Sequence, residues 1–330
     1  EIIPLVLSNK IYKNRLMFCS DGLDPSDITN IGHIDHCVRE SIKLGMNPID
    51  AISMASKNCF DYYKMGTEFG GIGPGKIADI LILDDYKKIK INKVILGGKI
   101  VVSDGKLVQQ LHTPKVPAWM QKTVKIPKLY PKFFNVNSKN TDETVNTILM
   151  KTEIVTQKNT SNLDVKDSNV VASYDKDIWK VAALDRTFGS KTHAVGFLEN
   201  FGADIGAFAS TWSFHENDMI VIGSNENDMA DACNKLTKSQ GGLIIVKDGK
   251  TLASLPFQLG GIISTDPIEK VTKNFTKIND VLSDSGCKFK KPHLIPLFLP
   301  FLALPDIRIL YSGIVDVKSR SFIPTIQTNL

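Results

Sequence analysis

Asp21 is the residue of this sequence that is best placed to do chemistry. It follows residues 15–19 (Arg-Leu-Met-Phe-Cys), a short apolar run of strand length that ends abruptly at Ser20-Asp21-Gly22. A carboxylate at the C-terminal end of a strand can meet a metal ion held by other strands, as catalytic groups in barrel enzymes do. The alternative is that Asp21 caps the following turn, and the neighbouring sequence has to decide between the two interpretations.

A second polar group lies at residues 215–218. His215, Glu216, Asn217 and Asp218 precede an apolar run at 219–222 that predicts a buried strand. These side chains can line the mouth of a site or bind an ion. The alternative is a polar loop in which Asn217 and Asp218 make a turn.

Two further pairs of residues have both a functional and a structural interpretation. His33 and Asp35 begin the helix that follows the Asp21 loop, where they either shape the loop above a metal or cap the helix. Trp212 and Phe214 either stack on a planar ligand ring or belong to the core.

The remaining candidates carry no recognisable motif. His112, His193 and His293 have no partner at metal-ligand spacing, and Gly73 and Gly75 lack the Lys-Ser/Thr ending of a phosphate loop. The five cysteines form an odd set without a CxxC pair, which is typical of reduced thiols and favours a cytoplasmic protein.

Composition excludes several classes of protein. A length of 330 residues predicts about two domains, and a hydrophobic fraction of 42% can form real cores. A net charge of +5 gives no support for a nucleic-acid partner. The most apolar stretch, residues 294–304, is shorter than the about 20 residues of a membrane helix and contains two prolines, so we expect no membrane partner. Because the first residue is not Met, we expect that upstream sequence is missing.

The first third of the chain predicts helices followed by a small sheet. Apolar residues at four-residue spacing run from Ile34 to Gly45, and Asn47-Pro48 predicts the start of another helix. Glycine-rich residues 70–75 lead to a strand at 78–83, and residues 93–102 form two β-type runs separated by Gly97-Gly98.

A connector separates this part from the rest. Residues 113–134 contain five Lys, four Pro and no acidic residue, and residues 135–173 are rich in Asn, Thr, Ser, Lys and Asp. We expect an excursion with one strand there.

The last part predicts an α+β domain. Strands are expected at 180–184 and 219–222, a helix through Met229, Cys233 and Leu236, and a hairpin around Asp248-Gly249. A longer helix with one apolar stripe is expected between Asp266-Pro267 and Gly286.

The sequence around Asp21 resembles the end of an amidohydrolase domain. The segments that carry this resemblance are Cys19-Ser20-Asp21-Gly22, Gly32-His33-Ile34-Asp35, residues 47–58 and residues 71–80. The second half resembles the C-terminal domain of the adenine deaminase family, through residues 206–211, 223–229, 241–242, 255–256, 286–287, 301–305 and 313–316. The resemblance covers nearly the whole chain outside the connector.

The resemblance implies a fold of α/β and α+β class. Residues 1–64 would be the last strand and helices of a (β/α)8 (TIM) barrel, 65–112 a segment of the small β domain, 113–173 the connector, and 174–330 the α+β C-terminal domain of this family. Most of the barrel is absent before Leu16, so the chain resembles a C-terminal portion of such an enzyme.

The resemblance also implies a reaction. Members of this family hydrolyse adenine to hypoxanthine and ammonia in the cytoplasm, by attack of a hydroxide activated by Mn²⁺ or Fe²⁺ on C6 of the purine. Asp21 would be both a metal ligand and the catalytic proton acceptor, and His33, His215, Glu216, Asn217 and Asp218 would bind substrate or form a loop. One Asp cannot hold a catalytic ion, so most ligands are expected outside this chain, which by itself is expected to be inactive.

One departure from the family keeps alternatives open. Where the family has His-Asp-Ser-His-Asn, this chain has Phe-His-Glu-Asn-Asp at 214–218, which indicates a divergent branch. The alternatives are a related amidohydrolase that acts on another cyclic amidine or amide, and a non-catalytic protein that acts in binding or assembly. The apolar stretch 294–304 further predicts a homo-oligomer.

Overall fold

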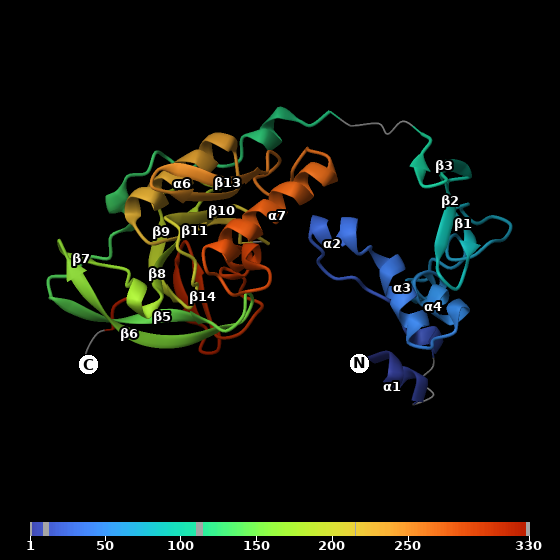
Figure 1. Ribbon diagram of the computed structural model, residues 1–330, viewed down its shortest axis with the longest axis horizontal. Coiled ribbons are helices and arrows are strands. Elements are labelled where there is room, and N and C mark those ends of the chain that lie inside the picture. Colours follow the sequence, from blue (N-terminus) through green and yellow to red (C-terminus); the bar gives the residue numbers. More distant parts are fainter. Residues whose placement is uncertain (1, 9–12, 110–114, 215, 328–330) are drawn as a thin grey trace. The chain divides into compact units, whose positions relative to one another are not determined.

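The computed structural model describes residues 2–8, 13–109, 115–214 and 216–327, and the chain divides into two compact units (Figure 1). The first unit is Glu1–Lys115 and the second is Val116–Leu330. Each unit has its own secondary structure and its own core, and we describe them separately.

The N-terminal unit consists of short helices followed by a four-stranded antiparallel sheet in sequential order. Its elements are α1 (Ile2–Ser8), η1 (Lys13–Arg15), α2 (Pro25–Asn30), α3 (Ile34–Lys43), α4 (Pro48–Met54), α5 (Lys57–Tyr62), β1 (Ile80–Asp85), β2 (Lys90–Leu96), β3 (Lys99–Ser103) and β4 (Lys106–Leu107). The predicted helix start at Asn47-Pro48 is confirmed, because the Asn47 side chain accepts a 2.9 Å hydrogen bond from Ile49 N. The two predicted strands at 93–102 are confirmed as β2 and β3, with Gly97 and Gly98 at positive φ in the turn between them.

The strand predicted at residues 15–19 is wrong. Residues 13–15 form the 3₁₀ turn η1, and residues 16–21 have no regular secondary structure. In this part of the described chain the backbone bonds to a helix end instead of a strand, through Phe18 N and Met54 O at 3.0 Å. A β-strand needs a neighbouring strand to satisfy its backbone groups, and none pairs with these residues within the described N-terminal unit.

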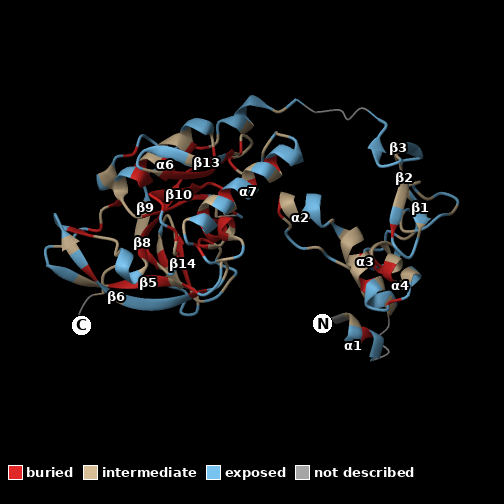
Figure 2. Cartoon of the chain, viewed as in Figure 1, coloured by how far each residue is buried: buried red, intermediate tan, exposed pale blue. Residues whose placement is uncertain are grey.

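The core of the N-terminal unit is small. Its fully buried apolar side chains are Val6, Val38, Met46, Ala51, Met54 and Ile89. Large apolar side chains remain at the surface, including Ile72 at 86% and Tyr63 at 69% exposure. Most of this unit is coloured as intermediate or exposed, with few buried residues (Figure 2). Apolar exposure of this extent is typical of a surface that other polypeptide covers.

The C-terminal unit is built on a nine-stranded mixed sheet with the order β13-β12-β10-β11-β8-β9-β5-β6-β7. The strands are β5 (Asp142–Met150), β6 (Thr156–Lys166), β7 (Asn169–Val170), β8 (Ile178–Asp185), β9 (His193–Glu199), β10 (Ala207–Ser210), β11 (Asp218–Gly223), β12 (Gly242–Lys247) and β13 (Lys250–Pro256). The pair β5–β9 is parallel, whereas the other pairs are antiparallel. The predicted hairpin around Asp248-Gly249 is confirmed as β12–β13.

Two helices cover opposite faces of this sheet (Figure 1). Along β8, Trp179, Val181 and Ala183 belong to the core that contains α7 (Ile268–Asp284). The alternate residues Ala182 and Leu184 belong to the core that contains α6 (Glu226–Ser239). The period of two places successive side chains on opposite faces, so the unit has three layers.

The structure corrects the expectation of one strand between residues 135 and 173. This stretch contributes three strands, β5, β6 and β7, to one edge of the large sheet. Its polar composition is misleading because tertiary contacts satisfy the buried polar side chains: Thr147 donates to Glu199 at 2.9 Å and Thr156 donates to Ile307 O at 2.7 Å. The 3₁₀ turns η2 (Ala118–Gln121), η3 (Pro131–Phe134) and η4 (Tyr174–Lys176) lie before and after these strands.

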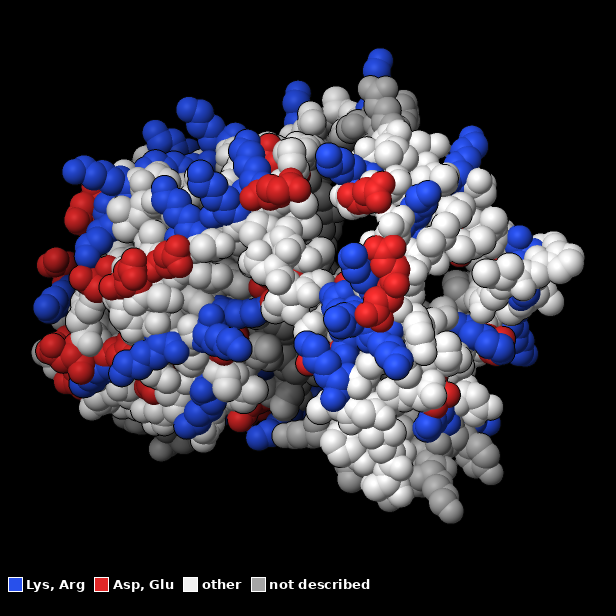
Figure 3. Space-filling model, turned by 45° about the vertical axis from the view of Figure 1, so that its right-hand side comes forward, with Lys and Arg blue, Asp and Glu red and all other residues white. Residues whose placement is uncertain are grey.

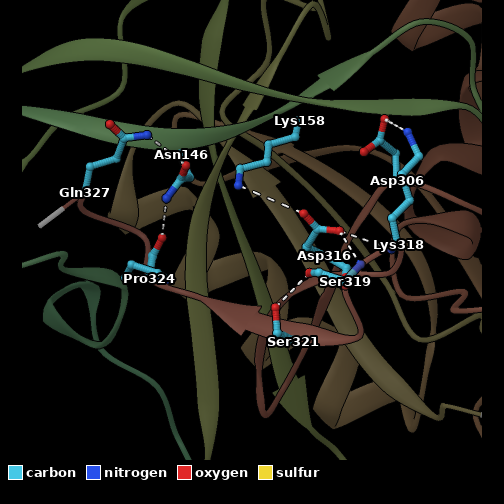
Figure 4. Close-up of polar contacts among 9 residues, drawn as sticks. All are labelled: Asn146, Lys158, Asp306, Asp316, Lys318, Ser319, Ser321, Pro324 and Gln327. Atoms are coloured by element: carbon cyan, nitrogen blue, oxygen red, sulfur yellow. Dashed lines mark hydrogen bonds and ion pairs between the residues drawn. The ribbon is translucent and has the colours of Figure 1, made fainter.

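The end of the described chain is fastened to β5 and β6 by polar contacts (Figure 4). After η5 (Pro292–Leu294) and α8 (Ile295–Phe298), a three-stranded sheet forms from β14 (Ile307–Leu310), β15 (Gly313–Asp316) and β16 (Ser321–Ile323). Asn146 of β5 donates to Pro324 O at 2.8 Å and accepts from the Gln327 side chain at 3.2 Å. Lys158 of β6 approaches Asp316 at 4.0 Å.

The apolar stretch 294–304, from which we expected an oligomer interface, is mostly used inside the unit. Ile295, Leu297 and Leu299 are 0–4% exposed and join the core, whereas Leu302 is 36% exposed. The stretch therefore gives little support for an interface.

Candidate active site

Asp21 lies in an exposed loop of the N-terminal unit. Its φ is 54°, in the left-handed region, which Asp tolerates better than most residues. One carboxylate oxygen accepts a 2.7 Å hydrogen bond from Gly22 N, and Asp21 N approaches Cys19 Sγ at 3.4 Å. The side chain is thus oriented by its own turn while remaining open to a ligand.

The structure brings His33 near the Asp21 loop. Ser20 Oγ lies 3.3 Å from His33 Nε2, which connects the residue before Asp21 to the start of α3. The helix-capping interpretation of Asp35 is also supported, because Asp35 accepts a 2.7 Å hydrogen bond from His33 N.

Asp35 is held ionised by its surroundings. Partial burial raises the pKa of this carboxyl, but the His33 N–H and the Arg39 guanidinium, 2.6 Å away, together lower it by a larger amount. The net pKa is therefore below the ordinary value of 3.8. The bonds of Asp35 to His33 N and to Arg39 fix the orientation of the turn that carries His33.

These residues do not form a metal site among themselves. Within the described ranges, no three His, Cys, Asp or Glu side chains converge as a metal would require. Asp21 offers the oxygen ligand that divalent ions accept, but a single carboxylate does not hold a catalytic ion.

The residues of the second predicted group bond to different parts of the C-terminal unit. His215 lies outside the described residues. Glu216 Oε1 accepts from Leu302 N at 3.3 Å, and Asn217, at φ 57°, accepts from Arg186 Nη2 at 3.1 Å. Asp218 is the first residue of β11 and is 1% exposed, so it belongs to a buried strand and not to the polar turn of the alternative interpretation.

Asp218 lies in a buried polar cluster, which we call the Asp218 cluster and define as Asp185, Arg186, Asn217 and Asp218. The register places Asp218 opposite Asp185 where β8 and β11 meet. Asp218 Oδ2 accepts from Tyr311 N at 2.9 Å, whereas Oδ1 has no hydrogen-bond partner among the described residues. Arg186 is 2% exposed and donates to Gly260 O at 2.9 Å.

Burial dominates the electrostatics of this cluster. Burial raises the pKa of Asp218 to about 7, although the hydrogen bond from Tyr311 N has the opposite, smaller effect. Burial lowers the pKa of Arg186 to about 10, although the negative charge of Asp218 has the opposite, smaller effect. For Asp185 burial raises the pKa, but donors from Phe188, Ser190 and Thr187 outweigh it, and the net pKa is below 3.8. Asp218 is thus a carboxyl that exchanges its proton near neutral pH.

Sequence reasoning missed Asp185 and Arg186. Asp185 is the last residue of β8 and Arg186 follows it, whereas the strand was predicted only at 180–184. A charged pair directly after an apolar run was the available signal. Arg186 donates to Gly260 O and to Asn217 Oδ1, which lie far along the chain, and no local spacing indicates these contacts.

The aromatic residues beside the cluster belong to packed groups. Trp212 contacts Phe257, Phe275 and His293 at ring-centroid distances of 5.5–6.2 Å, which supports the core interpretation. Phe214 is 41% exposed and lies 4.5 Å from Phe301.

The raised pKa of Asp218 predicts a specific pH dependence of stability. The folded state holds this proton up to about pH 7, whereas the unfolded chain releases it near 3.8, so stability is lost as the pH rises between these values. The difference corresponds to about 4 kcal/mol. In Asp218→Asn this loss should disappear. We expect a gain of about 2 kcal/mol at pH 8, because Arg186 loses a counter-charge at the same time.

Urea unfolding at several pH values measures this effect. Asp185→Asn is the control of opposite sign: its pKa is lowered in the folded state, so that variant should lose stability above pH 4 and little below it. An unchanged slope between pH 4.5 and 7 in Asp218→Asn would contradict the assignment.

Comparison with family models gives two matches. The model described as adenine deaminase C-terminal domain matches residues 153–321, and the amidohydrolase family model matches residues 3–101. The two matches together cover most of both units.

Curated relatives match over nearly the whole chain. An adenine deaminase of Cenarchaeum symbiosum is 53% identical over 326 residues, which are 99% of this chain and 54% of that protein. Adenine deaminases of Clostridium botulinum and Desulforamulus reducens are 30% and 32% identical, over 98% of this chain and 54% and 56% of their own lengths. The chain thus spans about half the length of the relatives it matches.

Proposed function

This chain belongs to the adenine deaminase family, and from that membership we propose that the complete protein hydrolyses adenine to hypoxanthine and ammonia. The observation that carries the proposal is the joint match of an amidohydrolase segment and an adenine deaminase C-terminal domain, in that order, within one chain. A fold alone does not determine a substrate, whereas this combination of domains is specific.

Asp21 is the residue of this chain that we assign to the reaction. Hydrolytic deamination needs a group that takes a proton from water and delivers a proton to the departing amine. The Asp21 carboxylate is exposed and oriented by the Gly22 N–H, so it can serve both steps at one oxygen. His33, beside Ser20, would contact substrate or support the loop.

The amidohydrolase family implies a divalent metal ion. We propose Mn²⁺ or Fe²⁺, which when bound would supply a water of lowered pKa. Asp21 would contribute one ligand, and the others would come from the part of the relatives that this chain does not match. By itself the chain would then be inactive.

The role of the C-terminal residues also remains a proposal. We place Glu216, Asn217 and Asp218, together with His215, in a segment that binds substrate or forms a loop near it. The support is a carboxyl in this segment with a pKa of about 7, the range in which acid-base groups operate.

The domain boundaries are proposals in the same sense. We assign residues 1–64 to the end of the amidohydrolase barrel domain, 65–112 to the small β domain, 113–173 to the connector and 174–330 to the C-terminal domain. The order of the two family matches supports the order of these parts, whereas β5, β6 and β7 join residues 142–170 to the sheet of the C-terminal unit.

Partners and location follow from several observations. No helix among the described residues has the length and apolar character that crossing a bilayer requires. Figure 3 shows Lys and Arg interspersed with Asp and Glu on the face drawn, which favours a small-molecule substrate over nucleic acid. Five free cysteines support a cytoplasmic location. Exposed apolar side chains of the N-terminal unit support a homo-oligomer, which sedimentation would test.

Ammonia release from adenine by the complete protein, loaded with Mn²⁺ or Fe²⁺, tests the function. We expect stoichiometric hypoxanthine and ammonia. Metal-loaded protein that deaminates or hydrolyses another cyclic amidine or amide, but not adenine, would reject adenine as the substrate. Protein that binds no metal after expression in supplemented medium would indicate a non-catalytic role.

A further inference from the structure

The C-terminal unit contains a cavity of about 400 Å³ that the proposed reaction does not use. It lies where η4, the loop after β9 and the loop after α7 meet, and its walls include Tyr174, Asp177, Trp179, Gly202, Gly286 and Phe289. This volume falls within the range of small-molecule sites. None of its lining residues belongs to the Asp218 cluster.

Asp177 joins the loops that form the cavity. Its Oδ1 accepts two hydrogen bonds, from Trp179 Nε1 at 2.8 Å and from Gly202 N at 2.9 Å. Its backbone oxygen accepts from Asn200 N at 3.0 Å. The second loop is connected to the third through Asp204 N and Ser285 O at 2.7 Å. The walls are therefore fixed before any ligand arrives.

The cavity presents acceptor oxygens close together. Both hydrogen bonds of the Asp177 side chain use Oδ1, which leaves Oδ2 without a partner among the described residues. A Cβ placed on Gly202 would lie 3.8 Å from this Oδ2 and 3.2 Å from Gly286 O. Both glycines have positive φ, at 75° and 108°, and a side chain at Gly202 would crowd Gly286 O, so glycine allows the two loops to approach closely beside the cavity. These acceptors favour a ligand that donates hydrogen bonds.

Charge selects among such ligands. Asp204 is neutralised by Lys247 at 2.9 Å, whereas Asp177 has no ion-pair partner in the described chain. The Trp179 ring contacts the carboxylate by its Nε1 edge, and its centroid lies 4.9 Å from that of the Tyr174 ring, which is 54% exposed. An exposed aromatic ring near a carboxylate without an ion pair favours a cation, and an ammonium group carries three donors.

We propose that this cavity binds a small primary ammonium ion with an aromatic or other apolar body. The ammonium donates to Asp177 Oδ2 and Gly286 O, and the apolar body contacts Tyr174 and Phe289. Lys288 also lines the cavity, so its own positive charge opposes an incoming cation. The site is independent of adenine deamination and of any metal.

Benzylammonium, titrated into the complete protein and followed by calorimetry and by tryptophan fluorescence, tests the proposal. We expect saturable binding. In Asp177→Asn, which keeps the Oδ1 acceptor but removes the charge, the affinity should fall about tenfold. In Lys288→Met it should rise about threefold, because a repelling charge is removed. Phe289→Ala should also weaken binding.

The matched control is Asp175→Asn, which removes an exposed carboxylate from the same 3₁₀ turn but outside the cavity lining. Thermal unfolding checks that every variant is folded. An equal loss of affinity in Asp175→Asn would show that overall charge causes the effect and would overturn the site. Equal binding of the neutral analogue benzyl alcohol, or absence of saturable benzylammonium binding, would also overturn it.

Discussion

Replacing Asp21 by asparagine should lower the rate of ammonia release from adenine by about 10²–10⁴-fold, the range lost when a general acid-base group is removed. Asparagine has nearly the shape of aspartate and can still accept the Gly22 N–H bond, so the turn should persist. What disappears is the negative charge that, in our proposal, takes a proton and contributes a metal ligand. The loss should appear mainly in kcat, measured on the complete metal-loaded protein.

The matched control is Asp104→Asn. Asp104 is also exposed and also left-handed, with φ 52° against 54° for Asp21, but it lies in the turn between β3 and β4. Its replacement should leave the rate within a factor of about two, because a surface change of this kind rarely alters stability by more than about 0.5 kcal/mol. Full activity in Asp21→Asn would refute the assigned role of Asp21, even if the protein proves to be an adenine deaminase.

Glu226→Ala should destabilise the C-terminal unit by about 3 kcal/mol, because it leaves a buried ammonium without its counter-charge. Lys180, which is 1% exposed, bonds to Glu226 at 2.6 Å, to Asn169 at 2.8 Å and to Phe134 O at 3.1 Å. This contact ties the connector to β8 and to the start of α6. Burial lowers the pKa of Lys180, so its charge is already costly in the folded protein.

The Lys180–Glu226 pair also predicts that the free energy of unfolding decreases at acidic pH. Burial raises the pKa of Glu226, but the Lys180 ammonium lowers it by a larger amount, so the net pKa is below the ordinary value of 4.5. The stabilisation by ionised Glu226 is therefore present above pH 4.5 and is lost as the pH falls through its folded-state pKa. Glu226→Ala should lack this acid-dependent loss of stability.

Tryptophan fluorescence during urea unfolding measures both effects, because Trp119, Trp179 and Trp212 all lie in the C-terminal unit. Lys180→Met is the informative companion: it removes the buried charge and leaves Glu226 24% exposed to water, so we expect a loss of only about 1 kcal/mol. Lys270→Ala breaks an exposed pair with Asp266 and should cost less than about 1 kcal/mol. A smaller loss in Glu226→Ala than in Lys180→Met would contradict this account.

Local signals in the sequence predicted the elements whose hydrogen bonds form between residues close together in the chain. The helix before Gly45, the start at Asn47-Pro48 and the hairpin at Asp248-Gly249 depend on contacts within a few residues. Turn and cap chemistry of this range is readable from sequence. The family resemblance carried by the residues around Asp21 was equally local, and the family matches confirm it.

Elements that depend on distant partners could not be predicted in this way. The apolar run at 15–19 has the composition of a strand but pairs with no strand in the described N-terminal unit. Conversely, the polar stretch after the connector becomes three strands, because partners such as Glu199 and Ile307 satisfy its buried side chains. Composition reports the average environment of a segment, whereas strand pairing is decided by what lies beside it.

The sequence by itself determined the family, the order of the two parts and Asp21 as the candidate catalytic residue. Only the tertiary structure showed that Arg186, Asn217 and Asp218 meet, and that Asp177 faces a cavity with an unpaired oxygen. The physical reason is that burial and long-range pairing set the charge state of a side chain. Neither property is written in the spacing of residues along the chain.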